Sequence, residues 1–273
     1  LDMLMVPVAL YDTLKLIQQQ SPEISLTSRW AFGLESQPAL PPAHENLVMQ
    51  ALELFQQHLQ EKHGKSFGLS VDLVKRIPAA AGLGGASSDA AAALVGANRL
   101  NGNLLSLEEL TFMAAQVGSD VPFFLYQSPA RCQGRGEKVT PVSSPQPLPV
   151  VLVKPTAGLS TPSVFGRVAE FGFEDRQSID DMLQVFTSGD LSGVGRALHN
   201  RLLEPALAVL PELQEVVHLL QDFDVAGFQM TGSGSTFFMI CRHANQAKNL
   251  AARLRQRKLG AVIDTYTIGQ PFG

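Results

Sequence analysis

The chain has 273 residues, of which 45% are hydrophobic and 17% charged, a balance typical of a globular protein with a sizeable core. The formal net charge of -4 argues against nucleic acid as a partner, because a phosphate backbone requires a basic surface. The sequence shows no apolar run long enough to span a membrane and no secretory signal pattern, and its 2 cysteines lie far apart. We therefore expect a reducing compartment and no disulfide framework.

The first half of the chain predicts strands and helices in turn. Residues 3–17 predict two strands around a turn at Tyr11, and residues 30–34 predict a third strand. Apolar residues at helical spacing predict a helix over residues 46–63, and strict alternation predicts a strand over residues 68–77. A glycine-rich stretch follows. The elements expected after it are an alanine-rich helix over residues 87–100 and a capping-box helix that starts at Ser106 and ends near residue 118.

The second half begins with a predicted linker at residues 143–149, SSPQPLP, which holds three prolines and no charge. A strand over residues 150–154 and two or three helices between residues 162 and 222 are expected next. The chain then predicts a strand–turn–strand unit over residues 226–241, a helix over residues 245–259 and a strand over residues 261–268. We expect an α+β protein with two lobes, residues 1–145 and residues 146–273.

The stretch PAAAGLGGASS, which begins at Pro78, lies between the predicted strand and the alanine-rich helix. The first amides of a helix lack internal partners, and glycines let the backbone present several amides to one anion. The stretch therefore predicts a phosphate-binding loop. It lacks the Gly-Lys-Ser/Thr of a Walker loop, and Ser87 stands where the dinucleotide fingerprint has its third glycine. A plain flexible turn before a close-packed helix is the alternative.

Three motifs in order give a more specific match. The segments are the loop with Asp89-Ala90-Ala91 behind it, GSDVPFF from Gly118, and MTGSGST from Met230. Together they resemble the motifs of the GHMP kinases. This resemblance implies a two-lobed α+β GHMP kinase fold, with a ribosomal-protein-S5-domain-2-like N-terminal lobe and a ferredoxin-like α/β C-terminal lobe.

Within the superfamily, the chain is most similar to the kinases of 4-diphosphocytidyl-2-C-methyl-D-erythritol. The segments that carry this likeness are LYDTL from Leu10, Glu45-Asn46-Leu47, Arg135-Gly136-Glu137 and Lys154-Pro155 with Ser160-Thr161. The resemblance implies transfer of the γ-phosphate of ATP, with Mg²⁺, to the 2-hydroxyl of that cytidine diphosphate-linked methylerythritol. This reaction belongs to the methylerythritol phosphate route to isoprenoid precursors. It also implies a small-molecule substrate, no nucleic-acid or membrane partner, and a monomer or homodimer in the cytoplasm.

Other functions stay open at this point. One is another GHMP small-molecule kinase, of the homoserine or mevalonate type. A second is a nucleotide-binding module without catalysis. A third is a structural RNA-binding protein, against which the acidic balance argues.

The resemblance assigns a role to each of fifteen residues. Asp120 is the expected base that accepts the proton of the attacking hydroxyl. The residues expected to bind ATP are Pro78, Gly82, Gly84, Gly85, Ser87 and Ser88 at the phosphates, with Asn46 and Lys75 near the nucleoside. The residues expected to bind the substrate are Thr161, Phe165, Gly232, Ser233, Gly234 and Met5. The histidines and cysteines show no metal-ligand spacing, so no metal-binding side chains are expected.

Each role has a structural alternative. The alternatives are a turn aspartate for Asp120, helix caps for the two serines and Asn46, and a solvated lysine for Lys75. Phe165 stands at helical spacing from Val168 and so also suits a core position. The glycines of MTGSGST suit an ordinary hairpin turn. Ala86 replaces a glycine common in the family, and we expect either ordinary dihedrals there or an altered loop.

The resemblance also shows a departure at the N-terminus. The family has an N-terminal strand with a lysine and, later, a Tyr-His pair, and neither precedes LDMLMV in this sequence. We therefore expect that the sequence lacks the natural start, with any segment that targets the protein to a plastid. An exposed sheet edge and a slower phosphoryl transfer would follow.

Overall fold

The computed structural model describes residues 1–34, 37–144, 146–172 and 178–269, which form two compact units. Unit 1 comprises Leu1–Met5, Leu10–Ala79 and Gly84–Pro141. Unit 2 comprises Val6–Ala9, Ala80–Leu83 and Val142–Gly273. The glycine-rich loop is thus shared, since its first half belongs to unit 2 and its second half to unit 1. Pro145, in the predicted linker, lies outside the described residues.

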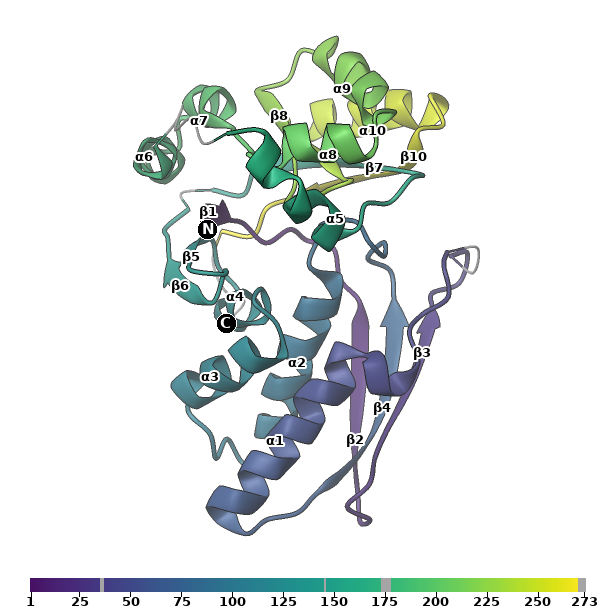
Figure 1. Ribbon diagram of the computed structural model, residues 1–273, viewed down its shortest axis with the longest axis vertical. Coiled ribbons are helices and arrows are strands. Elements are labelled where there is room, and N and C mark those ends of the chain that lie inside the picture. The colour runs from purple at the N-terminus through teal and green to yellow at the C-terminus, as the bar shows by residue number, and fades with distance from the viewer. Residues whose placement is uncertain (35–36, 145, 173–177, 270–273) are drawn as a thin grey trace. The chain divides into compact units, whose positions relative to one another are not determined.

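Unit 1 is built on a three-stranded sheet in the order β2-β4-β3, in which β4 is antiparallel to β2 and parallel to β3. The strands are β2 (Thr13–Gln19), β3 (Ile24–Trp30) and β4 (Gly68–Lys75). Helices α1 (Leu47–His63) and α2 (Gly85–Leu100) lie along one face of this sheet (Figure 1). Leu69, Val71 and Leu73 alternate along β4 and are almost fully buried, so the period of the sequence places the core under the two helices.

Smaller elements complete unit 1. They are the 3₁₀ turn η1 (Ala43–Glu45), helices α3 (Leu107–Val117) and α4 (Val121–Tyr126), and the sheet of β1 (Asp2–Met5), β5 (Ala130–Gln133) and β6 (Lys138–Pro141). Ser106 caps α3 in a complete capping box with Glu109, as its sequence predicts. Strand β2 borders an apolar groove of about 370 Å³, whose walls include Leu16, Val95 and Phe124.

Unit 2 contains an antiparallel sheet in the order β10-β7-β9-β8. Its strands are β7 (Pro149–Pro155), β8 (Gly227–Met230), β9 (Phe237–Ile240) and β10 (Gly260–Tyr266). Its helices are α5 (Thr161–Gly166), η2 (Val168–Glu170), α6 (Ile179–Ser188), α7 (Leu191–Ala197), α8 (Leu203–Val209), α9 (Leu213–Gln221) and α10 (Ala244–Gln256). Helices α8, α9 and α10 gather over one face of the sheet, where Val151, Val153 and Met239 form the core with them (Figure 1).

The structure corrects two expectations from the sequence. The strand predicted at residues 30–34 is wrong, because the strand is Ile24–Trp30 and a turn follows it in which Phe32 is fully exposed and Gly33 has a φ of +83°. Five α-helices, not two or three, lie between Thr161 and Gln221 in the described part of the chain, because each has ten residues or fewer and so gives the sequence too few turns to separate one helix from the next.

Candidate active site

The glycine-rich loop ends where α2 begins. Gly84 is the N-cap of α2 in the left-handed region, and the first bond of the helix runs from the amide of Ser88 to the carbonyl of Gly84. The amides of Gly85, Ala86 and Ser87 therefore precede the helical hydrogen-bond pattern, as the first amides of a helix do. Ala86 lies inside the helix with ordinary dihedrals, which settles the question that its sequence raised.

The serines of the loop differ in their environment. The hydroxyl of Ser88 donates to the carbonyl of Gly85 at 2.8 Å, so Ser88 stabilises the first turn of α2. Ser87 is half-buried one position earlier, and Pro78 is half-buried in the loop itself. A phosphate bound at this helix N-terminus would meet backbone amides first, because these amides carry the positive end of the helix dipole.

In unit 2, the first half of the loop lies against the MTGSGST segment. The hydroxyl of Thr231 donates to the carbonyl of Gly82 at 3.1 Å, and the amide of Thr236 donates to the carbonyl of Ala81 at 3.4 Å. A Cβ atom at Gly82 would lie 2.6 Å from the carbonyl oxygen of Thr231, so only glycine permits this contact. Two motifs that the sequence marks separately are thus in direct contact.

Asp120 directly precedes α4 at the N-cap position, yet its side chain makes no capping bond. Burial raises the pKa of this carboxyl above its ordinary value, and a hydrogen bond from Ser119 opposes the rise. Phe124 of the following helix packs against Gly84, where a Cβ atom would lie 2.7 Å from the ring. The segment that carries Asp120 is therefore packed against the start of α2 within unit 1.

A small apolar cluster lies behind Asp120 in unit 1. Phe123, Ala130 and Cys132 are buried in it, and Met5, at the end of β1, packs against them. Burial, together with the charge of Asp120, raises the pKa of the Cys132 thiol to about 12, so this cysteine stays protonated. Both cysteines, Cys132 and Cys241, are buried and free.

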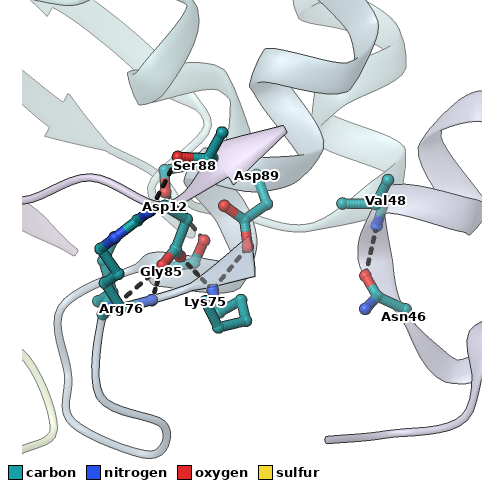
Figure 2. A network of polar contacts seen from close by, with 10 residues as sticks. Asp12, Asn46, Val48, Lys75, Arg76, Gly85, Ser88 and Asp89 are labelled. Carbon is teal, nitrogen blue, oxygen red and sulfur yellow. Dashed lines mark hydrogen bonds and ion pairs between the residues drawn. The ribbon is translucent and has the colours of Figure 1, made fainter. Parts of the chain in front are cut away.

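The two residues expected at the nucleoside have clear structural partners in unit 1 (Figure 2). Asn46 caps α1, since its side-chain oxygen accepts from the amide of Val48 at 3.0 Å. Lys75 is only 8% exposed and forms ion pairs with Asp12 and with Asp89, the latter at 2.6 Å. The solvated alternative for Lys75 is therefore wrong, whereas the capping alternative for Asn46 is present in the structure.

The predicted substrate residues of unit 2 form a group of their own. The hydroxyls of Thr161 and Ser233 lie 2.8 Å apart, which joins the start of α5 to the turn formed by Gly232, Ser233 and Gly234. Phe165 is 41% exposed, and its neighbour Val164 is the residue buried in the core. The core position that helical spacing suggests for Phe165 is therefore wrong, and the ring of Phe165 is accessible.

Asn200 also belongs to this group, although no role was expected for it from the sequence. Its side-chain nitrogen donates to the carbonyls of Met230 and Gly232, each at 2.8 Å, and its oxygen accepts from the amide of Leu202. These bonds hold the entry to the glycine turn. The two carbonyls are thirty or more positions away, so no local pattern could have indicated this role.

Known proteins are similar to this chain in sequence and in fold. Residues 46–128 match the family described as the GHMP kinases N terminal domain, and residues 182–259 match GHMP kinases C terminal. A 4-diphosphocytidyl-2-C-methyl-D-erythritol kinase of Geobacillus sp. is 34% identical over 255 residues, which are 93% of this chain and 83% of the relative. The kinase of the same name from Exiguobacterium sibiricum is 36% identical over 253 residues, 93% and 84% of the two chains.

Solved structures agree on the fold. The crystal structure of a 4-(cytidine 5'-diphospho)-2C-methyl-D-erythritol kinase superposes with a TM-score of 0.76 at 30% identity, over 98% of this chain and 90% of the other. A homoserine kinase from Cytophaga hutchinsonii gives a TM-score of 0.77 at 20% identity, over 98% and 90% of the two chains, and supports the fold alone. Among the described helices, none is both long and apolar enough to cross a membrane. The matched domains, the relatives and the fold together place this chain in the GHMP kinase family.

Proposed function

We propose that this protein is an ATP-dependent kinase that phosphorylates the 2-hydroxyl of 4-diphosphocytidyl-2-C-methyl-D-erythritol, a step of the methylerythritol phosphate route to isoprenoid precursors. The observation that carries the proposal is the identity of 34% and 36% to two kinases of this substrate along 93% of the chain. The free amides at the start of α2 are the chemistry that such a kinase needs for phosphate.

In unit 1, the proposed reaction needs one base and a phosphate cradle. Asp120 accepts the proton of the substrate 2-hydroxyl, and the oxygen of this hydroxyl attacks the γ-phosphorus of ATP. The bond to the β,γ-bridging oxygen then breaks, and ADP leaves with the bonding electron pair. The amides of Gly85, Ala86 and Ser87 stabilise the negative charge on the phosphates. The raised pKa of Asp120 makes its carboxylate a better proton acceptor than an exposed aspartate.

In unit 2, the proposed substrate contacts are the ring of Phe165 and the paired hydroxyls of Thr161 and Ser233. An exposed aromatic ring suits stacking on cytosine, and adjacent hydroxyls suit hydrogen bonding to diphosphate or polyol oxygens. Gly232 and Gly234 keep the backbone of the turn open to the substrate. Met5 and Asn46 keep their proposed places beside the substrate and the nucleoside, in addition to the packing and capping contacts they make.

Mg²⁺ is part of this proposal as the ion that accompanies ATP and neutralises phosphate charge. The described residues contain no group of three His, Cys, Asp or Glu side chains placed to hold a metal. Such a cage is not required, because Mg²⁺ in kinases binds through phosphates and one or two carboxylates. We assign it no ligand from this chain. The buried free cysteines support a reducing, cytoplasmic location.

The deciding experiment measures ADP release and product mass with the cytidyl substrate for the wild type, Asp120→Asn and Asp72→Asn. Asp120→Asn keeps the shape but removes the base, and should lower kcat by about 10²–10⁴-fold. Asp72→Asn is the matched control and should leave kcat unchanged, because Asp72 is a half-exposed carboxylate of β4 that pairs with Arg29 of β3.

The outcomes separate the remaining functions. Turnover of homoserine or mevalonate in place of the cytidyl substrate would mean another kinase of the family. ATP binding without turnover of any of these would mean a nucleotide-binding form. Wild-type rates in Asp120→Asn would exclude Asp120 as the base.

A further inference from the structure

Three charged side chains are buried together behind the glycine-rich loop in unit 1. The side chains of Lys75, Asp12 and Asp89 are 10%, 3% and 7% exposed. The ammonium of Lys75 donates to one oxygen of Asp12 and, at 2.6 Å, to one oxygen of Asp89 (Figure 2). We call these residues the ion triplet.

Each member of the ion triplet comes from a different part of the chain. Asp12 precedes β2, Lys75 is the last residue of β4, and Asp89 lies in the second turn of α2. The second oxygen of Asp12 accepts from the amides of Arg76 and Ile77, the latter at 2.9 Å. One carboxylate therefore fixes the backbone that enters the loop, and the lysine connects it to the helix that leaves the loop.

The two ends of the loop also touch directly. A Cβ atom at Gly85 would lie 2.9 Å from the side chain of Ile77 and 3.4 Å from the ammonium of Lys75. The first residue of α2 thus rests on the strand end that the ion triplet holds. A shift of either end would move the amides of Gly85, Ala86 and Ser87.

The ion triplet is a costly way to stabilise a fold. Removing charges from water costs several kcal/mol per ion, and well-packed apolar side chains often stabilise as well or better. With all three groups ionised, one negative charge stays uncompensated close to a proposed phosphate site. This arrangement suits a geometric role, since charged hydrogen bonds have narrow distance and angle requirements.

We infer that Lys75, Asp12 and Asp89 are positioning residues that hold the start of α2 in the geometry that binds the phosphates of ATP. Lys75 acts through its two carboxylates and does not itself contact the nucleotide, in contrast to the contact near the nucleoside that its sequence position suggests. The inference rests on the proposed function for its link to ATP, and on the contacts within unit 1 for the rest.

The test compares Lys75→Met, Asp89→Asn, Asp12→Asn and the double variant Lys75→Met/Asp89→Asn with the wild type. Lys62→Met, which removes the exposed lysine paired with Glu109, is the matched control. The measurements are KM for ATP, kcat, and amide hydrogen exchange over residues 76–88 without nucleotide. Each single variant should raise KM for ATP by about tenfold, a loss of about 1.4 kcal/mol. Each should also speed exchange in the loop, and the control should change neither.

Non-additivity identifies the mechanism. If the residues act as one unit, the double variant should be no worse than the more affected single variant. A raised KM in Lys75→Met alone, with wild-type values in both aspartate variants, would show direct contact with the nucleotide and overturn the inference. If the increase in KM for ATP of the double variant equalled the product of the two single increases, the residues would act independently, and this would also overturn the inference.

The exchange measurement separates this inference from the proposed function. If the wild type fails to turn over the cytidyl substrate, the proposed function fails, but faster loop exchange in the variants still supports positioning. Unchanged exchange in all variants overturns the inference, whatever the activity. If Lys75→Met does not fold because it leaves two carboxylates unpaired, the two isosteric aspartate variants decide the result.

Discussion

The hydroxyl of Thr231 donates a hydrogen bond to the carbonyl of Gly82, a residue 149 positions earlier in the chain. Both residues belong to unit 2, so this bond ties the glycine-rich loop to the turn that follows β8. A loop that must present amides to a phosphate benefits from being held before the nucleotide arrives, because ordering costs are then already met.

Thr231→Val should therefore weaken ATP binding. The substitution keeps the shape and loses one hydrogen bond, which is worth about 1 kcal/mol, so KM for ATP should rise about fivefold. Thr231→Ser keeps the hydroxyl and should stay close to the wild type. Steady-state kinetics at varied ATP decide the matter, and equal values of KM in the two variants would mean that the bond does not position the loop.

Gly136 lies against the proposed base. A Cβ atom there would be 3.3 Å from a carboxylate oxygen of Asp120, and the backbone has a φ of +128°. Gly136→Ala should displace Asp120 and lower kcat by roughly tenfold to a hundredfold. It should also destabilise the fold by about 1–3 kcal/mol, because alanine is strained at this φ.

Gly134→Ala is the control for that prediction. Its φ is +74°, but the three atoms nearest to a Cβ there all belong to the carboxylate end of the Glu137 side chain. We expect a similar loss of stability with kcat near the wild-type value. Kinetics and urea unfolding measure both effects, and an equal loss of kcat in the two variants would show that backbone strain, not contact with Asp120, is responsible.

The acid side of the pH–rate profile should depend on Ser119. Burial raises the pKa of Asp120, and the hydrogen bond from Ser119 lowers it in part. Ser119→Ala removes the lowering effect, so the pKa should rise further and activity should appear only at higher pH. The profile of kcat/KM against pH tests this, and a shift toward lower pH would contradict the roles given to both residues.

Local patterns explain how much the sequence could predict. The period along β4 and the capping box at Ser106 involve partners a few residues apart, and both predictions are confirmed. The helix predicted after the glycines is present too, but it begins at Gly85 rather than at Ser87. The cap formed by Asn46 also has its partner two positions away. By contrast, Lys75 meets Asp12 from 63 positions away, and only the pairing of β2 with β4 brings them together.

The unpredicted contacts of the site share this property. Asn200 reaches the glycine turn from thirty or more positions away, and Thr231 reaches Gly82 across most of the chain. Motif resemblance indicated the candidate segments, but it could not say which side chains would contact one another. The exposure of Phe165 could not be predicted either, because helical spacing does not reveal that α5 ends at Gly166.

Asp89 gives the ion triplet a measurable pH signature. Burial, together with the charge of Asp12, raises its pKa to about 7 against the opposing effect of Lys75, while the ordinary value is 3.8. Between these two pH values the folded state holds a proton that the unfolded state has released. The contribution of Asp89 to the free energy of unfolding is therefore greatest below about pH 4, falls as the pH rises to about 7, and is constant above.

The contribution of Asp89 to the free energy of unfolding should fall by at most about 4 kcal/mol over this pH range, since each pKa unit corresponds to about 1.4 kcal/mol. Subtracting the unfolding free energy of Asp89→Asn from that of the wild type separates this contribution from those of other acidic groups. Glu109→Gln is the opposite case, because its bonds to Lys62 and Ser106 lower the pKa of Glu109 to about 2. The difference in unfolding free energy between the wild type and Glu109→Gln should be constant from about pH 5 to 7 and shrink only in more acidic solution. Urea unfolding from pH 4 to 8 measures both differences, and a flat difference for Asp89→Asn would mean that its carboxyl stays ionised beside Lys75.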